Sequence, residues 1–153
     1  MSDKLKEQLK LLCRLDKEVD DIYSNIAAHF GMPDTEFWIL YAVSHSQGEV
    51  TQKDLQKEFL FPVQTINSAI GKLIKKDLVE LRVIPKTKNR KEILLTEKGA
   101  KFVKNTIDKV DEIECNALSL FDENERKQFL SFLCRHVENL KREKERAFGC
   151  SPA

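Results

Sequence analysis

Apolar residues recur at alternating steps of three and four over the first thirty positions of the chain. Between residues 3 and 30 they form one stripe with a heptad-like seam, which predicts a single long amphipathic helix. The stripe consists of Leu5, Leu9, Leu12, Val19, Tyr23, Ile26 and Phe30. At about 1.5 Å per residue such a helix is roughly 40 Å long, more than one small domain needs to cover itself. Part of this seam is therefore expected to contact a second chain.

The next segments carry the signals of two further helices. Gly31 is expected to end the first helix, and Asp34 is expected to cap the second. Residues 37–43 are apolar on nearly every side, so the second helix is expected to lie in the core. Thr51, with Asp54 three positions later, resembles a capping box and predicts a short third helix.

A fourth helix and a β-hairpin follow. Pro62 suits the first turn of the helix, and apolar residues recur along one side of it. This inward stripe comprises Ile66, Ala69, Ile70, Leu73 and Ile74. Residues 78–84 and 93–95 are β-prone, and the basic stretch 85–91 between them predicts the tip of a hairpin. A minimal strand at Val50 is a further candidate.

Two helices are predicted for the last third of the chain. Thr96 is a good N-cap for a long helix, and Asp122 with Glu125 forms the capping-box pattern that opens the last one. Their apolar positions are Phe102, Val103, Ile107, Val110, Ile113, Ala117, Leu118 and Phe121, and then Phe129, Leu130, Phe132, Leu133, Val137 and Leu140. The predicted order is α-α-α-α-β-β-α-α. It describes a mainly α (α+β) fold, a winged helix-turn-helix with long N- and C-terminal dimerisation helices.

Length and composition are those of an ordinary globular protein, with 153 residues, 41% apolar and 33% charged. We expect a single domain, 1–153, in which residues 34–99 form a winged-helix lobe. Residues 3–30 and 100–146 are expected to form a helical dimerisation region. No apolar run approaches the roughly 18 residues that a membrane span requires, and the first residues do not resemble a signal peptide. A cytoplasmic protein with no membrane partner is therefore expected.

Positive charge is concentrated in the middle of the chain. Residues 51–101 hold twelve Lys or Arg against six Asp or Glu, although the net charge of the whole chain is only +1. A basic centre between acidic flanks is typical of a localised surface for a polyanion. A solvated charged face is the alternative, and charge alone does not separate the two.

The side chains of this basic centre indicate DNA as the polyanion. Two short helices joined by a tight turn match a helix-turn-helix, whose second helix enters the major groove. The predicted DNA-binding residues on these helices are Thr51, Gln64, Thr65, Asn67, Ser68, Lys72 and Lys75. The amides of Gln64 and Asn67 suit adenine, and the neighbouring hydroxyls suit phosphates or pyrimidine edges. The lysines, together with Lys76, suit phosphates.

The hairpin tip is a second predicted point of attachment. Its basic residues are Lys86, Lys88, Arg90 and Lys91. On a narrow ribbon they can approach the adjacent minor groove or the backbone, and Arg90 suits a narrow groove because its guanidinium is planar and weakly hydrated. A charged hairpin that protects its own edges from aggregation is the alternative.

Four short stretches stand at the landmarks of this pattern. They are Thr51-Gln52-Lys53-Asp54-Leu55, Gln64-Thr65-Ile66-Asn67-Ser68-Ala69-Ile70, Leu73-Ile74-Lys75-Lys76-Asp77-Leu78-Val79 and Leu95-Thr96-Glu97-Lys98-Gly99. In combination they resemble the MarR family of bacterial transcription regulators. The resemblance implies a homodimer on pseudo-palindromic double-stranded DNA and repression relieved by a small ligand or an oxidant.

The resemblance also implies interlocked terminal helices and an Asp-x-Arg in each wing. The predicted dimerisation residues are Leu5, Leu9, Leu12, Val19, Phe129, Leu133, Val137 and Leu140. In the wing this chain departs from the family pattern, because Thr87 and Asn89 stand at the Asp and Arg positions. Arg90, one position later, is inferred as the substitute.

No enzyme, metal or cofactor is predicted. His29, His45 and His136 share no metal-ligand spacing, and the five glycines form no phosphate-binding loop. The four cysteines, Cys13, Cys115, Cys134 and Cys150, contain no C-x-x-C pair. We expect them to be reduced, with buried apolar filling favoured over a role in sensing oxidants.

Two alternatives concern the effector and the partner. Trp38, Tyr41 and His45 are candidates for lining an effector pocket, against the simpler interpretation that they pack in the core. A winged helix can also serve as a protein–protein interaction module without sequence-specific DNA binding. Salt dependence separates the two functions, because only binding to DNA releases condensed counterions.

Overall fold

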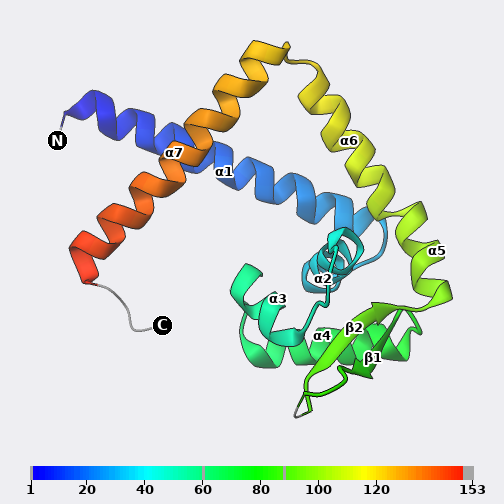
Figure 1. The fold of residues 1–153 in the computed structure, drawn as a ribbon. Helices are drawn as coiled ribbons and strands as arrows, with labels where there is room; N and C mark the ends of the chain where they lie inside the picture. Colours follow the sequence, from blue (N-terminus) through cyan, green and yellow to red (C-terminus); the bar gives the residue numbers. More distant parts are fainter. Residues whose placement is uncertain (1, 60, 88, 150–153) are drawn as a thin grey trace. The chain divides into compact units, whose positions relative to one another are not determined.

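The computed structural model describes residues 2–59, 61–87 and 89–149. Its elements are α1 (Asp3–His29), α2 (Asp34–His45), α3 (Gln52–Phe59), α4 (Val63–Lys75), β1 (Val79–Val83), β2 (Lys91–Leu95), α5 (Glu97–Asn105), α6 (Ile107–Ser119) and α7 (Glu123–Phe148), shown in Figure 1. The predicted class, a mainly α fold with a two-stranded wing, is confirmed. The chain divides into two compact units, Met1–Val110 and Asp111–Ala153.

One apolar cluster holds the first unit together. Its fully buried side chains include Phe37, Ile39, Leu40, Leu55, Ile66, Leu73, Ile93, Ile107 and Val110. They come from α2, α3, α4, β2 and α6, so the helix-turn-helix, the wing and the start of α6 share a core. The inward stripe predicted for α4 is narrower than expected, because Ile74 is 40% exposed.

Proline stands at the N-cap of both α2 and α4. Pro33 and Pro62 have extended backbones and provide no side-chain cap. Asp34 was expected to cap α2, but it is the first residue of that helix. Its carboxylate instead accepts a hydrogen bond from Ser24 Oγ at 2.7 Å, which connects α1 to the start of α2.

α4 ends in a Schellman motif with an aspartate in the left-handed region. Asp77 has φ = 57°, its N–H donates to Ile74 O at 2.9 Å, and the N–H of Leu78 donates to Leu73 O at 3.0 Å. Glycine is the usual residue at this position, since a Cβ is strained at positive φ. The turn that ends α4 therefore requires a backbone conformation that Asp77 disfavours.

Replacing Asp77 with glycine is expected to stabilise the chain by about 0.5 to 1 kcal/mol, because the strain at positive φ disappears. The matched control is Gly31→Asp, since Gly31 has φ = 66° at the end of α1 and a Cβ there meets nothing within 4 Å. That change should destabilise the chain by a similar amount. Urea unfolding measures both free energies, and a less stable Asp77→Gly chain would contradict the expectation.

The wing is a regular antiparallel hairpin. β1 pairs with β2 from Val79 opposite Leu95 to Val83 opposite Lys91. Thr51 forms an isolated bridge with Glu92 just before α3. The minimal strand predicted at Val50 corresponds to this bridge and is displaced by one residue.

The start of α5 is fastened to the end of α4. Thr96 caps α5 by accepting from Gly99 N at 2.9 Å, and its hydroxyl donates to Asp77 O at 2.7 Å. Lys98 Nζ donates to Lys76 O at 2.6 Å, which satisfies a carbonyl at the end of α4. The backbones approach so closely that a Cβ on Gly99 would lie 1.9 Å from Leu78 O.

A long helix was expected from Thr96 to Phe121, but two helices occupy this stretch. α5 ends at Asn105, and its C-cap residue Thr106 has φ = −126° and ψ = −72°. The Thr106 hydroxyl donates to Phe102 O at 2.8 Å, a bond to the preceding turn that bends helices. The break turns the apolar side of α6 so that Ile107 and Val110 are buried.

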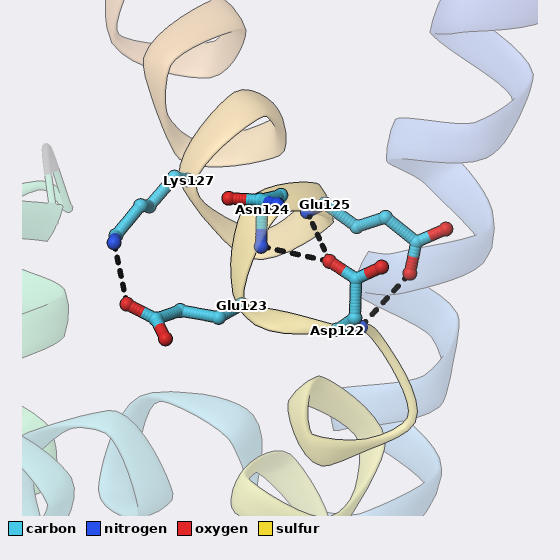
Figure 2. Close-up of polar contacts among 5 residues, drawn as sticks. All are labelled: Asp122, Glu123, Asn124, Glu125 and Lys127. Atoms are coloured by element: carbon cyan, nitrogen blue, oxygen red, sulfur yellow. Dashed lines mark hydrogen bonds and ion pairs between the residues drawn. The ribbon is translucent and has the colours of Figure 1, made fainter.

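The second unit, from Asp111 onward, contains the rest of α6 and α7. The predicted capping box opens α7, as Figure 2 shows. Asp122 Oδ1 accepts from the N–H groups of Asn124 at 2.7 Å and Glu125 at 2.9 Å. Glu125 Oε2 accepts from Asp122 N at 2.8 Å, and Lys127 pairs with Glu123 one turn apart. The capping box stabilises the first turn of α7 through local hydrogen bonds. No described residue of α7 is buried in the single chain.

Candidate nucleic-acid interface

α4 presents a polar face opposite its buried stripe. Its exposed predicted DNA-binding residues are Gln64, Thr65, Asn67, Ser68, Lys72 and Lys75. They are exposed because the buried residues of the helix occupy the other side of its 3.6-residue period. The face thus combines two amides, two hydroxyls and two ammonium groups, which can donate to phosphates and to base edges.

An ion pair connects the end of α4 to α2. Glu36 is only 2% exposed, and its Oε2 lies 2.6 Å from Lys76 Nζ. Lys76 was expected to favour phosphate, but its ammonium neutralises this buried carboxylate. A shallow hollow of about 340 Å³ lies beside the pair, lined by Pro33, Thr35, Glu36, Gln64, Thr65, Ser68, Ala69 and Lys72.

A larger hollow brings α3, α4 and the wing tip together. Its volume is about 980 Å³, and its lining includes Gln52, Lys53, Lys57, Asn67, Arg90 and Lys91. In Figure 1 the β1–β2 hairpin lies beside α4, with which β1 is in contact. Side chains from two predicted contact regions, α4 and the wing, therefore border one concave surface.

Asp54 is the acidic member of this surface. The Thr51 hydroxyl donates to Asp54 Oδ2 at 2.5 Å and holds the pKa of this carboxyl below its usual value. The Thr51 N–H, at 3.0 Å, and the positive charges of Arg90 and Lys57 act in the same direction. Thr51 itself is 5% exposed, so its atoms serve the start of α3 and not the outer surface.

A cross-strand ion pair braces the wing close to its tip. Arg82 Nε lies 2.8 Å from Glu92 Oε1, and these residues are directly opposite in the register. Beyond the brace, Lys86, Arg90 and Lys91 are exposed. Lys88 was also predicted to bind DNA, but it lies outside the described residues.

Gln52 was not among the predicted site residues. Its Nε2 donates to Asn67 Oδ1 and so joins the first residue of α3 to the polar face of α4. No periodicity identifies such a contact, because the partners lie fifteen residues apart on different helices. The only available signal is the position of Gln52 directly after the cap residue of a helix-turn-helix.

The three candidate effector residues belong to a cluster of aromatic rings. Trp38 lies 5.1 Å from Tyr23, 5.4 Å from Tyr41 and 5.9 Å from Phe59 between ring centroids. Tyr41 stacks on His45 at 4.2 Å. Neither of the two hollows described above is lined by these three residues, so an effector pocket at this cluster stays a prediction.

Both terminal helices expose apolar side chains. On α1, Leu5, Leu9 and Val19 are about half exposed, and Leu12 is partly exposed. On α7 the predicted dimerisation residues Phe129, Leu133, Val137 and Leu140 are all exposed. Within the described part of the chain, none of the helices combines the length and apolarity that crossing a lipid bilayer demands.

The cysteines differ from the expectation of buried filling. Cys13, Cys115 and Cys134 are exposed free thiols, because each lies on a part of α1, α6 or α7 that the chain itself leaves uncovered. Cys150 lies outside the described residues. Among the residues that are described, no group of three or more His, Cys, Asp or Glu is placed to hold a metal ion.

The helix-turn-helix, the antiparallel wing and the hydrogen bonds of Thr96 and Lys98 that join α5 to the end of α4 define a winged-helix protein. The model of the MarR family matches residues 30–88, which run from the end of α1 to the wing tip. A comparison with curated proteins finds no match.

Solved structures of regulators have the same fold. The S. aureus MepR–DNA complex is 25% identical, with 86% of this chain and 96% of that chain covered and a TM-score of 0.67. NMB1585, a MarR family regulator from Neisseria meningitidis, is 17% identical, with 92% and 98% covered and a TM-score of 0.77. A MarR/EmrR family regulator from Acinetobacter sp. ADP1 is 18% identical, with 93% and 99% covered and a TM-score of 0.70.

The chain is therefore a winged-helix protein that is similar to MarR-family transcriptional regulators, with the family model covering residues 30–88 and the shared fold covering most of the chain. The resemblance inferred from the four sequence stretches is thereby confirmed. MarR-family transcriptional regulators are not enzymes, and the expectation that this chain is not one agrees with its similarity to them.

Proposed function

We propose that the protein is a homodimeric bacterial repressor that binds a pseudo-palindromic operator in double-stranded DNA. The observation that carries the proposal is the shared concave surface, where Asn67 of the polar face of α4 borders one hollow together with Arg90 and Lys91 of the wing. The segment that contains them, residues 51–101, is strongly basic. MepR, which is similar to this chain in fold, has been solved in complex with DNA. Cytoplasmic localisation follows from access to the chromosome.

The proposed contacts divide by chemistry. Exposed amides and hydroxyls of α4 contact base edges or position the helix in the major groove, and its lysines contact phosphates. The major-groove set is Gln64, Thr65, Asn67 and Ser68, with Lys72 and Lys75 on phosphates. Arg90, Lys86, Lys88 and Lys91 hold flanking DNA, with Arg90 in place of the family's Asp-x-Arg. Thr51 is left out of the proposed contacts, because it is buried.

The proposed dimer uses the apolar faces of the terminal regions, residues 3–30 and 100–146. Leucines and valine of α1 and the exposed stripe of α7 remain uncovered by the chain itself, and monomeric proteins rarely leave apolar patches of this extent. A homodimer places two recognition helices about 34 Å apart, one turn of DNA. The winged lobes, residues 34–99, then read the two halves of the operator.

Relief of repression requires a ligand or oxidant that favours a state with poor DNA affinity, since an effector acts only through unequal affinity for two states. The cluster of Trp38, Tyr41 and His45 is the proposed place for a small aromatic or apolar effector. The exposed thiols are the proposed place for an oxidant, because accessible thiols are the ones that oxidants reach.

Salt titration with two variants tests DNA binding. If about six phosphates are contacted, affinity should fall roughly a thousandfold between about 50 and 200 mM salt. Arg90→Ala should weaken binding to every sequence and reduce the salt slope by about one, whereas Asn67→Ala should cost about 1 to 3 kcal/mol at particular base pairs.

Arg146→Ala is the matched control, because it removes an exposed positive charge from α7, outside the winged lobe. It should change neither the slope nor the sequence preference. A salt-independent partner, or equal and sequence-independent losses for Arg90→Ala and Asn67→Ala, would favour the alternative, a winged-helix module that binds protein.

A further inference from the structure

The amide of Asn67 is held at one end by a neighbouring helix. We propose that Gln52 is a positioning residue that makes Asn67 a hydrogen-bond donor toward DNA, so that the base it contacts carries an acceptor. This inference rests on the proposed DNA-binding function and deepens it. It assigns a base-pair preference and a residue that sets this preference from outside the recognition helix.

The observation is the bond from Gln52 Nε2 to Asn67 Oδ1. Gln52 is the first residue of α3 and is half-buried, whereas Asn67 is exposed on α4. α3 is a firm support for this bond, because Leu55 is fully buried and Asp54 is tied to Thr51 at the start of the helix. The carbonyl end of the Asn67 amide therefore faces α3.

An asparagine amide has one accepting oxygen and one donating NH₂ group at the two ends of a plane. With the oxygen engaged by Gln52, the NH₂ group is the end left to reach the DNA. In the major groove guanine presents the acceptors O6 and N7, adenine presents the acceptor N7, and thymine presents O4, whereas cytosine presents only the N4 amino donor. Asn67 should thus favour guanine, thymine or adenine at the contacted position and disfavour cytosine.

This arrangement changes the expectation from sequence alone. A bidentate contact to adenine uses the amide oxygen and the NH₂ group together, on N6 and N7. In the folded chain the oxygen accepts from Gln52 and faces α3, so the NH₂ group is the end that reaches the DNA without turning the amide. The bidentate adenine contact predicted for Asn67 is accordingly replaced by a single donating contact to a base acceptor, which adenine N7 can also provide.

The test is to reverse the amide. In Gln52→Glu the new carboxylate can only accept, so it should bind the Asn67 NH₂ group and turn the oxygen toward the DNA. A glutamate in the first turn of α3 is also favourable for the helix, and the chain should fold normally. At the Asn67 position cytosine, which the wild type disfavours, should then be preferred together with adenine, since their amino groups donate, and guanine and thymine should be disfavoured.

Gln56→Glu is the matched control. Gln56 also lies on α3 and lines the same hollow, but the hydrogen bond to Asn67 is made by Gln52. Both variants add one negative charge, which weakens DNA binding at all sequences alike. Only Gln52→Glu should reverse the base preference. In Gln52→Met the side chain cannot hydrogen-bond to Asn67, so neither orientation of the amide is favoured and the base preference should be nearly lost.

The experiment selects bound duplexes from a random-sequence library with the full-length wild-type chain and each variant. Comparison of the wild type with Asn67→Ala identifies the position that Asn67 contacts, because Asn67→Ala no longer discriminates between base pairs there. The affinities for duplexes with each of the four base pairs at this position are then measured. One oriented hydrogen bond corresponds to a preference of roughly fivefold, in opposite senses for wild type and Gln52→Glu. Circular dichroism confirms that the variants are folded.

Three outcomes are distinct. A preference that reverses in Gln52→Glu and persists in Gln56→Glu supports the proposal. Selected sites with the same preference in wild type and Gln52→Glu overturn it and leave the DNA-binding function standing. A wild-type chain that selects no duplex at low salt overturns both the function and the inference.

Discussion

A Gly99→Ala chain is expected to be less stable than the wild type by at least about 3 kcal/mol, because the added methyl group has no space. Its Cβ would lie 1.9 Å from Leu78 O and 2.8 Å from the carbonyl carbon of Leu78. Non-bonded carbon and oxygen atoms normally approach no closer than about 3.3 Å. The overlap is with backbone, which cannot turn away as a flexible side chain can.

The carbonyl of Leu78 is held in place from both sides. It accepts from Thr96 N at 3.2 Å, and the N–H of Leu78 donates to Leu73 O in the turn that ends α4. Moving it would separate α4, the wing and α5 at the point where Lys98 and Thr96 join them. The loss should therefore affect the whole winged lobe and not α5 alone.

Urea unfolding followed by the fluorescence of Trp38, the single tryptophan, measures this effect. Gly71→Ala is the matched control, since Gly71 lies inside α4 and a Cβ there meets nothing within 4 Å. That variant should be more stable by about 0.5 to 1 kcal/mol, because alanine is the better helix former. If the free energy of unfolding of Gly99→Ala lies within about 0.5 kcal/mol of the wild-type value, the close approach of Gly99 to the Leu78 carbonyl is contradicted.

Leu133→Glu is expected to convert the proposed homodimer into monomers and to weaken operator binding by about 100-fold or more. Leu133 is 48% exposed in the single chain, in the middle of the apolar stripe of α7. A carboxylate on this stripe cannot be buried against a partner without a compensating charge. Two unlinked lobes then bind two half-sites independently, and the gain from simultaneous binding is lost.

Ser131→Glu is the control for charge. Ser131 is exposed on α7, and residues two apart on a helix point in different directions. This variant should remain dimeric with nearly unchanged affinity. Sedimentation measures the oligomeric state, and titration with an operator duplex measures binding. A Leu133→Glu chain that stays dimeric would remove α7 from the proposed interface, and a monomeric chain with full affinity would refute the coupling of dimerisation to DNA binding.

Local pattern was sufficient for most of the elements. The apolar stripe of α4, the cap at Thr96 and the capping box at Asp122 are short-range features, because each depends on residues three or four positions apart. The hairpin also follows from two β-prone runs around a polar tip. The break at Thr106 was not predicted, since the apolar spacing continues through it and only the bond of its hydroxyl to Phe102 O reveals the bend.

The candidate site was predictable only in part. The sequence places amides and hydroxyls on one side of α4, because that side is simply the complement of a buried stripe. It does not show that Thr51 is buried, that Lys76 is engaged by Glu36, or that Gln52 holds Asn67. Each of these facts depends on which elements pack together, and charge and hydrogen-bonding capacity alone do not reveal the partner.

The sequence by itself determined the order of helices and strands apart from the division between α5 and α6, the basic centre of the chain and the polar face of α4. These properties arise from periodicity and composition, which are local. Tertiary structure alone decided that Gly99 must lack a side chain, that a buried carboxylate of α2 pairs with Lys76 at the end of α4, and that one amide on the candidate DNA-binding surface has its oxygen engaged. The physical reason is that these contacts join residues distant in sequence, whose proximity is created only when the apolar core assembles.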